Sequence, residues 1–217
     1  MTRISANVVV FVSVLCFLAL SATAAENNPS SVLIVYTVGQ PSEKFGDFTR
    51  EDLDAVTTAT GVSHNTKTVA SDLKQELESR GIQTTIVDGL ELKSHDIIFE
   101  HSVLVLGTPV RYAHIGWEMK KFIDEIMWRV RWLESRQFAG WPVAVYTMAG
   151  GSGAPALDYI KLIMGFFSTN VKAHGNFLST DGPRMKTKKI ESFADQIVEL
   201  LPEPPAGVSN YKVYDDK

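Results

Sequence analysis

Short apolar runs alternate with amphipathic segments along most of the chain. Five runs are rich in β-branched residues and carry almost no charge; they cover residues 31–36, 82–87, 102–107, 142–146 and 171–178. The runs at 31–36 and 102–107 are apolar at successive positions, which is typical of strands buried on both faces of a parallel sheet. We therefore predict five strands at these positions.

Segments with a helical period of apolar residues lie between or after these runs. They cover residues 66–79, 115–134, 156–167 and 188–201. In the first of them Val69, Ala70, Leu73 and Leu77 fall on one face, as expected for an amphipathic helix. Strands that alternate with helices form parallel sheets with right-handed crossovers, and five strands are too few for an eightfold barrel. The pattern predicts an α/β fold of three layers with a doubly wound five-stranded parallel sheet.

The first 25 residues have a different character. Residues 8–20 are almost uninterruptedly apolar, Arg3 precedes them, and Ala22-Thr23-Ala24 offers the small residues of a signal-peptidase site. The run is shorter than the ~20 residues that span a bilayer. We expect residues 1–25 to be a signal peptide that directs export to the periplasm or the medium, with a retained membrane anchor as the alternative. The single cysteine, Cys16, lies in this segment, so the mature chain would have no disulfide.

The rest of the sequence reads as one domain. Residues 31–201 form this domain, with a polar inserted loop at 39–61 and an extended, proline-containing tail at 202–217. Hydrophobic residues make up 45% and charged residues 21% of the chain, which is ordinary globular usage. The formal net charge of -4 argues against nucleic-acid binding, which requires a basic surface.

Three loops carry ligand-like chemistry, and they follow strands one, three and four. Ligands of doubly wound sheets bind beyond the carboxyl ends of the strands, where the strand order reverses. The first loop, 63–70, places hydroxyl and amide groups at a helix start, where phosphate can bind; capping by Ser63 or Asn65 is the alternative. The second, 107–117, contains Tyr112 and Trp117, which could stack on a planar ring or cover the core.

The third loop, 147–155, has glycines at 150, 151 and 153, which let a backbone approach a ligand closely. Its spacing is not G-x-G-x-x-G, so a dinucleotide-binding fingerprint is not met. The histidines outside these loops show no spacing of metal ligands, and we expect no metal. Trp128 and Trp132 lie four residues apart on the predicted helix, and we expect either the inserted loop or a subunit partner to cover them.

At these loops the sequence resembles the flavodoxin-like superfamily, and within it the FMN-dependent NAD(P)H:quinone and flavin reductases. The resemblance covers residues 31–201. Asn65-Thr66 before a helix is similar to the end of the family's phosphate loop, and Thr147 to Gly151 to its third loop. The most specific match is Gly107-Thr108-Pro109-Val110 with Met119-Lys120 and Phe122-Ile123-Asp124. The resemblance implies the strand order 2-1-3-4-5 and bound FMN.

The resemblance also implies which residues bind the cofactor. The phosphate would be held by Thr37, Asn65, Thr66 and Thr68. The ring would be lined by Thr108, Pro109, Val110, Arg111 and Tyr112, and its other side would be closed by Thr147, Ala149, Gly150 and Gly151. Arg111, Tyr112 and His114 are the candidate catalytic residues, since positive charge from Arg111 or His114 would stabilise the reduced ring. The flavin itself accepts hydride, so no acid–base pair is required.

Two features depart from the family pattern. The inserted loop separates the first strand from Asn65, and His64 stands where the family has glycine. The export signal is the second departure, because these enzymes are generally intracellular.

We expect an oxidoreductase that transfers electrons or hydride to a quinone, a flavin or a redox protein, with NAD(P)H as a candidate donor. An exported electron carrier and a binding module that has lost FMN are the alternatives, and a homodimer is left open.

Overall fold

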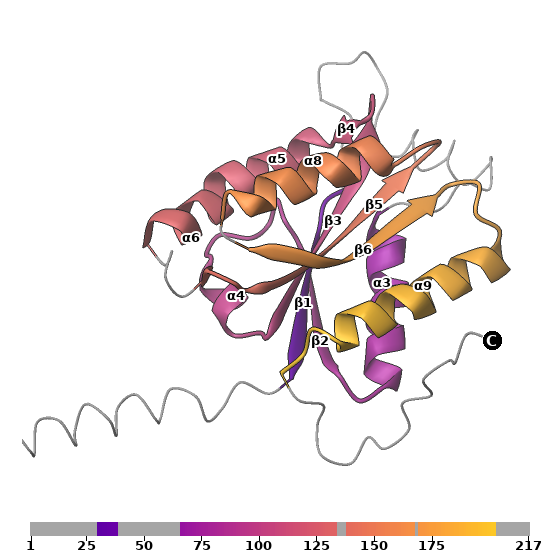
Figure 1. Ribbon diagram of the computed structural model, residues 1–217, viewed down its shortest axis with the longest axis horizontal. Coiled ribbons are helices and arrows are strands. Elements are labelled where there is room, and N and C mark those ends of the chain that lie inside the picture. The colour runs from indigo at the N-terminus through magenta and orange to yellow at the C-terminus, as the bar shows by residue number, and fades with distance from the viewer. Residues whose placement is uncertain (1–29, 39–65, 134–137, 168, 203–217) are drawn as a thin grey trace, which may run out of the picture.

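The computed structural model describes residues 30–38, 66–133, 138–167 and 169–202 (Figure 1). The predicted signal peptide, the inserted loop with Asn65, and the tail beyond Pro202 lie outside these residues. Among the residues described, no helix has the length and apolarity needed to cross a membrane.

The sheet has the flavodoxin-like topology. Its parallel strands are β1 (Ser31–Tyr36), β2 (Gln83–Asp88), β3 (Val103–Arg111), β5 (Pro142–Ala149) and β6 (Asn170–Leu178). They lie in the order β2-β1-β3-β5-β6, which confirms the predicted order 2-1-3-4-5. A short strand, β4 (His114–Ile115), pairs antiparallel with the end of β3 and makes a hairpin that the sequence did not predict.

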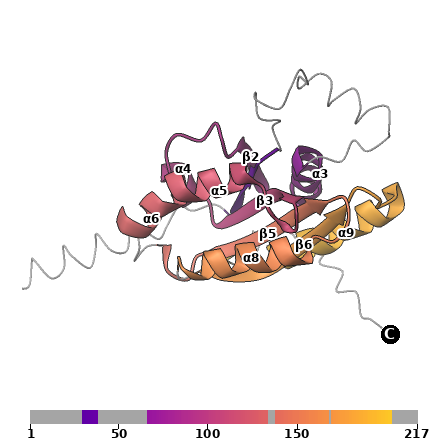
Figure 2. The ribbon, with the colours of Figure 1, turned by 90° about the horizontal axis from the view of Figure 1, so that it is seen from above.

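Helices cover both faces of the sheet (Figures 1 and 2). The helices α3 (Thr66–Ser79) and α9 (Pro183–Val198) pack on one face, and α8 (Ala154–Gly165) and α4 (Asp96–Phe99) pack on the other with the segment 117–133. Alternate residues of β1 divide between the two cores: Val32 and Ile34 face α3, whereas Leu33 and Val35 face the second layer. All four are fully buried, as the apolar run of the sequence required.

The segment 117–133 is a helix with a π-helical turn in its middle. It comprises α5 (Trp117–Phe122), the π segment η1 (Ile123–Met127) and α6 (Trp128–Leu133). Buried and exposed residues alternate in pairs from 118 to 129, a repeat of four residues. An α-helix has 3.6 residues per turn, and a π turn adds the residue that keeps this repeat in phase. This turn was not predicted from the sequence, although the repeat of four residues was its signal.

Other elements extend beyond the apolar runs from which they were predicted. The strands β3 and β5 continue through Thr108–Arg111 and Thr147–Ala149, which were predicted as loops. The last helix begins at Pro183 rather than at residue 188, because proline fits the first turn of a helix. The helix 66–79 has its predicted bounds, and the short α4 was not predicted.

Gly107 and Tyr146 form the tightest contact at the carboxyl end of the sheet. They face each other across β3 and β5, and a Cβ atom at Gly107 would overlap the phenol ring of Tyr146. That ring is fully buried and packs edge-on against Phe177 and Phe193. Its hydroxyl donates a hydrogen bond of 2.8 Å to the carbonyl of Thr66. Gly107 therefore leaves room for a side chain that ties the start of α3 to the sheet.

We expect Gly107→Ala to lower the free energy of unfolding by about 1–3 kcal/mol, because the added methyl group overpacks a buried contact. Gly165→Ala at the end of α8 is the matched control, since nothing lies within 4 Å of a Cβ atom there. Urea titrations of the two variants check this, and equal stability of both would contradict the contact.

Candidate functional site

A row of polar side chains crosses the carboxyl ends of four neighbouring strands. Thr108 of β3 lies opposite Thr147 of β5, and Thr147 lies opposite Asn176 of β6. Thr37 follows β1 directly, and its N–H donates to the carbonyl of Gly107 at 2.9 Å. The three threonines are fully buried. The sheet thus ends in hydroxyl groups at the edge where doubly wound folds bind ligands.

The hydroxyl groups of this row differ in what they bind. The hydroxyl of Thr108 donates to the carbonyl of Pro109 at 3.1 Å and accepts from the N–H of Gly116, also at 3.1 Å. The hydroxyl of Thr147 donates to Oδ1 of Asn176 at 3.2 Å. The hydroxyl of Thr37 has no hydrogen-bond partner among the described residues. A buried hydroxyl without a partner costs about 1–3 kcal/mol, so Thr37 is poised to bind a further group.

The hairpin of β3 and β4 begins at this row and projects from the edge of the sheet (Figure 1). Its turn consists of Tyr112 and Ala113, both with positive φ, 50° and 65°. Two such residues match the type I′ turn that suits the twist of paired strands, but the conformation is unfavourable for residues other than glycine and asparagine. The turn leaves Tyr112 fully exposed at the tip, where its ring is available to a ligand.

Arg111 at the base of this turn pairs with a buried carboxylate. Its Nη2 lies 3.3 Å from Oε1 of Glu118, whose side chain is fully buried while that of Arg111 is 39% exposed. Glu118 lies in the first turn of α5, where the helix dipole favours negative charge. Glu118 was not among the residues predicted for the site. Its charge offsets that of Arg111, so the hairpin carries less net positive charge than Arg111 alone would give it.

The start of α3 lies at the same edge of the sheet, on the face opposite to the one that α5 covers. Thr66 is buried and Thr68 is half-buried, and the carbonyl of Thr66 accepts the hydrogen bond of Tyr146. Burial, and then the neighbouring Tyr36, raise the pKa of Tyr146 well above its ordinary value. The phenol therefore stays protonated and keeps donating to the start of α3.

The backbone of the loop after β5 is exposed at two glycines. Gly150 and Gly151 are exposed, and a Cβ atom at Gly151 would meet nothing within 4 Å. Gly153 is different, because a Cβ atom there would overlap Thr147 and Asn176. The loop therefore packs on the polar row at Gly153 and leaves the backbone of Gly150 and Gly151 free to approach a ligand. Asn176 was missed in the sequence because only the register of β6 brings it beside Thr147.

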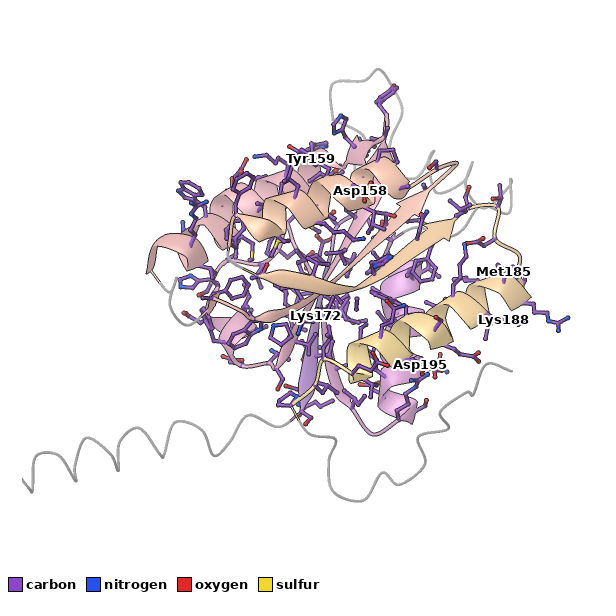
Figure 3. All side chains as sticks on the ribbon, viewed as in Figure 1. Asp158, Tyr159, Lys172, Met185, Lys188 and Asp195 are labelled. Atoms are coloured by element: carbon purple, nitrogen blue, oxygen red, sulfur yellow. The ribbon has the colours of Figure 1, made fainter. Side chains whose placement is uncertain are left out.

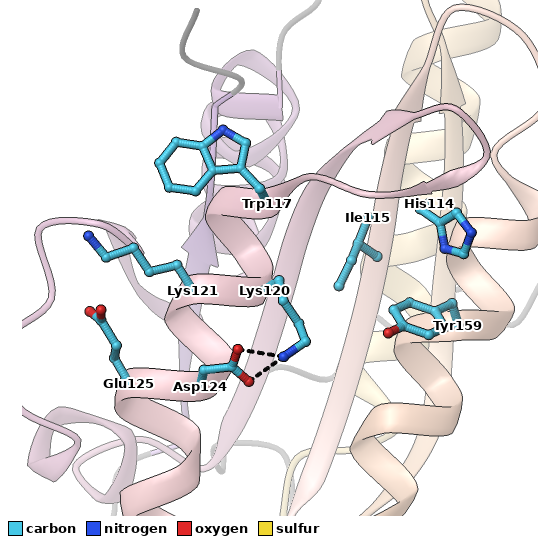
Figure 4. Close-up of a pocket in the computed structure, with 8 residues that line it drawn as sticks. All are labelled: His114, Ile115, Trp117, Lys120, Lys121, Asp124, Glu125 and Tyr159. Atoms are coloured by element: carbon cyan, nitrogen blue, oxygen red, sulfur yellow. Dashed lines mark hydrogen bonds and ion pairs between the residues drawn. The ribbon is translucent and has the colours of Figure 1, made fainter. Parts of the chain in front are cut away.

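An open groove of about 530 Å³ lies beside the hairpin, between α5 and α8 (Figure 4). Trp117 lies at its mouth, Ile115 lies between the two helices, and His114 packs edge-on against Tyr159 at 5.3 Å between ring centroids. The ion pair of Lys120 with Asp124 lines the same groove. His114 thus faces this groove, whereas Arg111 faces Glu118.

The predicted site residues fall into three groups in the structure. Thr37, Thr108 and Thr147 lie side by side in the polar row. The hairpin contains Pro109, Val110, Arg111, Tyr112 and His114. The end of β5 and the loop after it contain Ala149, Gly150 and Gly151. Thr66 and Thr68 begin α3, and Asn65 lies outside the described residues. All three groups lie at the carboxyl edge of the sheet.

No model of a protein family and no curated protein matches the sequence, whereas solved structures share its fold. A flavodoxin from the domain Archaea has a TM-score of 0.55 at 18% identity over 78% of this chain and 98% of its own. General stress protein 14 of Treponema denticola, solved in complex with FMN, has a TM-score of 0.54 at 12% identity over 78% and 99%. The WrbA-like flavodoxin of Agrobacterium tumefaciens has 0.51 at 14% over 79% and 97%. The chain therefore has the flavodoxin-like fold.

We expect the Tyr146 phenol to make stability depend on pH in the alkaline range. Because its pKa is raised in the folded protein, its contribution is complete below pH ~10 and falls as the pH rises above that value. The slope of this loss is at most about 1.4 kcal/mol per pH unit. Tyr146→Phe removes the slope and costs about 1 kcal/mol at neutral pH through the lost hydrogen bond.

Urea titrations across the alkaline range measure this slope. Tyr112→Phe is the control, since that phenol is surrounded by solvent in the folded protein. An alkaline slope that persists unchanged in Tyr146→Phe would show that the buried phenol is not its source.

Proposed function

We propose that the protein binds FMN at the carboxyl edge of its sheet and acts as an oxidoreductase. The observation that carries this proposal is the buried hydroxyl of Thr37, which has no partner among the described residues and stands at the strand-order reversal between β1 and β3. The solved structures that share this fold include one in complex with FMN, which the match covers over 99% of its own length. The general rule that doubly wound sheets bind ligands at this edge supports the proposed location.

The described residues fit the parts of such a cofactor. Thr37 and the first turn of α3, which contains Thr66 and Thr68, would present hydroxyl and backbone N–H groups to a phosphate, as helix N-termini do. The exposed ring of Tyr112 offers a stacking surface. The backbone of Gly150 and Gly151 can approach the other side without obstruction. The bound flavin would supply the hydride and electron chemistry.

The residues of the hairpin would then set the electrostatics of the ring. Arg111 carries a positive charge that favours a reduced, negatively charged ring, and Glu118 offsets this charge at 3.3 Å. The pair would therefore hold the reduction potential between the values that either charge alone would give. The turn would hold the backbone of Tyr112 in place before the cofactor binds, which reduces the entropy lost on binding.

Within this function we propose a reductase of the NAD(P)H:quinone or flavin type. The open groove beside His114 favours it over an electron carrier, which needs no substrate pocket. Rapid oxidation of NAD(P)H by the FMN-loaded protein, with a quinone as acceptor, is the expected result. Reduction by a redox protein alone would point to the carrier instead.

We expect Thr37→Val to weaken FMN binding roughly ten- to hundredfold, since a hydrogen bond to a charged group contributes about 1.5–3 kcal/mol. The variant should fold at least as stably as the wild type without cofactor, because it removes a buried hydroxyl that has no described partner. Ser31→Ala is the matched control: it removes a hydroxyl of the same kind at the other end of β1. Quenching of flavin fluorescence during titration measures both affinities. Equal affinities in the two variants would remove Thr37 from the site.

We expect Glu118→Gln to raise the reduction potential of the bound flavin by about 30 mV for the two-electron couple, equivalent to about 1.4 kcal/mol. The reason is that the charge of Arg111 is then no longer offset. Arg111→Ala should lower the potential without releasing the cofactor. Spectroscopic redox titration measures the shifts, with Asp158→Asn on the exposed side of α8 (Figure 3) as the control. Unchanged potentials in both variants would show that this ion pair does not act on the ring.

A further inference from the structure

The two outermost strands of the described sheet, β2 and β6, each have one edge without a neighbouring strand. Such an edge presents backbone N–H and C=O groups that can pair with a strand of another chain. The N–H of Ser179, directly after β6, donates to the carbonyl of Ala149 in β5 at 2.8 Å. Because the backbone groups of successive residues point to opposite sides of a strand, the even-numbered residues 174, 176 and 178 direct theirs away from the sheet.

Two of these outward backbone groups of β6 are held by side chains of α9, which lies beside the strand (Figure 1). The N–H of His174 donates to Oε1 of Gln196 at 3.1 Å. The carbonyl of Asn176 accepts a hydrogen bond from Nζ of Lys189, also at 3.1 Å. A strand of another chain would need the same N–H and C=O groups, so α9 competes for the edge that such a strand would use.

The turn between β6 and α9 holds a third outward group. The N–H of Leu178 donates to Oδ2 of Asp181 at 2.8 Å. The same carboxylate forms an ion pair with Lys189, whose Nζ lies 2.7 Å from Oδ2. The side chain of Asp181 is only 9% exposed, so salt screens this ion pair less than a surface pair. Lys189 and Asp181 therefore hold each other at the edge of β6, and each of them holds one backbone group of the strand.

The first part of β6 is protected in a different way, by a bulge. Val143 of β5 lies opposite Val171 and Ala144 lies opposite Ala173, so Lys172 is an extra residue in β6. Its side chain is exposed (Figure 3). Bulges bend a strand away from regular pairing, and exposed lysines disfavour the approach of another strand. The bulge thus interrupts the edge before the contacts with α9 begin.

The opposite edge of the sheet shows the same kind of contact. The N–H of Gly89, directly after β2, donates to the carbonyl of Tyr36 in β1 at 2.8 Å, so the even-numbered Thr84 directs its backbone groups outward. The carbonyl of Thr84 accepts from Nζ of Lys74 in α3, and Lys74 also pairs with Glu78. At both edges, therefore, a lysine held by a carboxylate reaches an outward carbonyl.

We propose that these side chains close the edge of β6 to other strands and so keep the sheet from continuing into a second copy of the chain. β6 has nine residues, whereas strands of about five or six residues are common in sheets, so its length is sufficient for pairing. A second copy is the partner expected for an opened edge, because two identical strands can pair antiparallel about a twofold axis. This proposal does not rest on the bound flavin.

Removing the two contacts from α9 tests the proposal. In Lys189→Ala with Gln196→Ala, the N–H of His174 and the carbonyl of Asn176 lose these partners, and alanine preserves the helix. The association constant between copies should rise at least about tenfold, since each hydrogen bond to a partner strand contributes about 1 kcal/mol. Sedimentation velocity over a concentration series measures this constant, and a value equal to that of the wild type would overturn the proposal.

Lys188→Ala with Ser192→Ala is the matched control. Both residues line the groove between β6 and α9, but the contacts to the edge of β6 come from Lys189 and Gln196. The two double variants change the net charge by the same amount. The control should associate no more than the wild type. Equal association in both double variants would show that the loss of charge is the cause, which would contradict the proposal.

A proline separates strand pairing from other kinds of association. Position 174 directs its N–H outward, so His174→Pro costs no hydrogen bond to β5 but removes a donor that a new strand requires. Added to the Lys189→Ala, Gln196→Ala variant, it should return the association constant to the wild-type value. Association that persists at the level of the double variant would mean that β6 is not the contact, and the proposal would be wrong.

Amide hydrogen exchange tests the same contacts without any association. In the single variant Gln196→Ala the N–H of His174 should exchange roughly tenfold faster than in the wild type, while that of Leu178, held by Asp181, should not change. This variant also decides the case if the double variant does not fold, because it leaves the ion pair of Lys189 with Asp181 intact. Equal exchange at His174 in both proteins would show that α9 does not close the edge.

Discussion

The common register of β1, β3 and β5 is the constraint on which the rest of the site depends. Parallel strands end at one edge, and here the buried apolar residues of each strand give way to a buried threonine at that edge. Two of these hydroxyls hold neighbouring backbone or side-chain groups, and the third has no partner among the described residues. Burial of this hydroxyl lowers the stability of the fold, and a hydrogen bond from a ligand would restore it.

The segments around this edge are joined through the core rather than through the surface. The absence of a side chain at Gly107 admits Tyr146, and Tyr146 holds the start of α3. Thr108 accepts from Gly116 and so fixes the base of the hairpin, while Gly153 lets the loop after β5 rest on Thr147 and Asn176. Each of these segments is therefore held by a buried contact with the ends of the strands.

The sequence predicted the layers, the strand order and the location of the four long helical segments, with both bounds right only for the helix 66–79, because apolar periodicity reports directly which faces are buried. It did not predict the β3–β4 hairpin, since Tyr112 and Ala113 lack the glycine or asparagine that normally marks a tight turn. Glu118 and Asn176 were missed because their roles arise from tertiary neighbours, Arg111 and Thr147. The π turn had a signal in the repeat of four residues from 118 to 129, which a search for a period of 3.6 overlooks.

Amide hydrogen exchange of the purified protein with and without added FMN tests the central claim most directly. If the polar row and its loops hold the cofactor, saturating FMN will slow exchange at Thr37, in the hairpin 108–116 and in the loop 150–153, and will leave the amino ends of the same strands unchanged. If FMN leaves exchange at these three segments unaltered, or slows it only in the groove between β6 and α9 that His174 and Lys188 line, the polar row and its loops are not the flavin site.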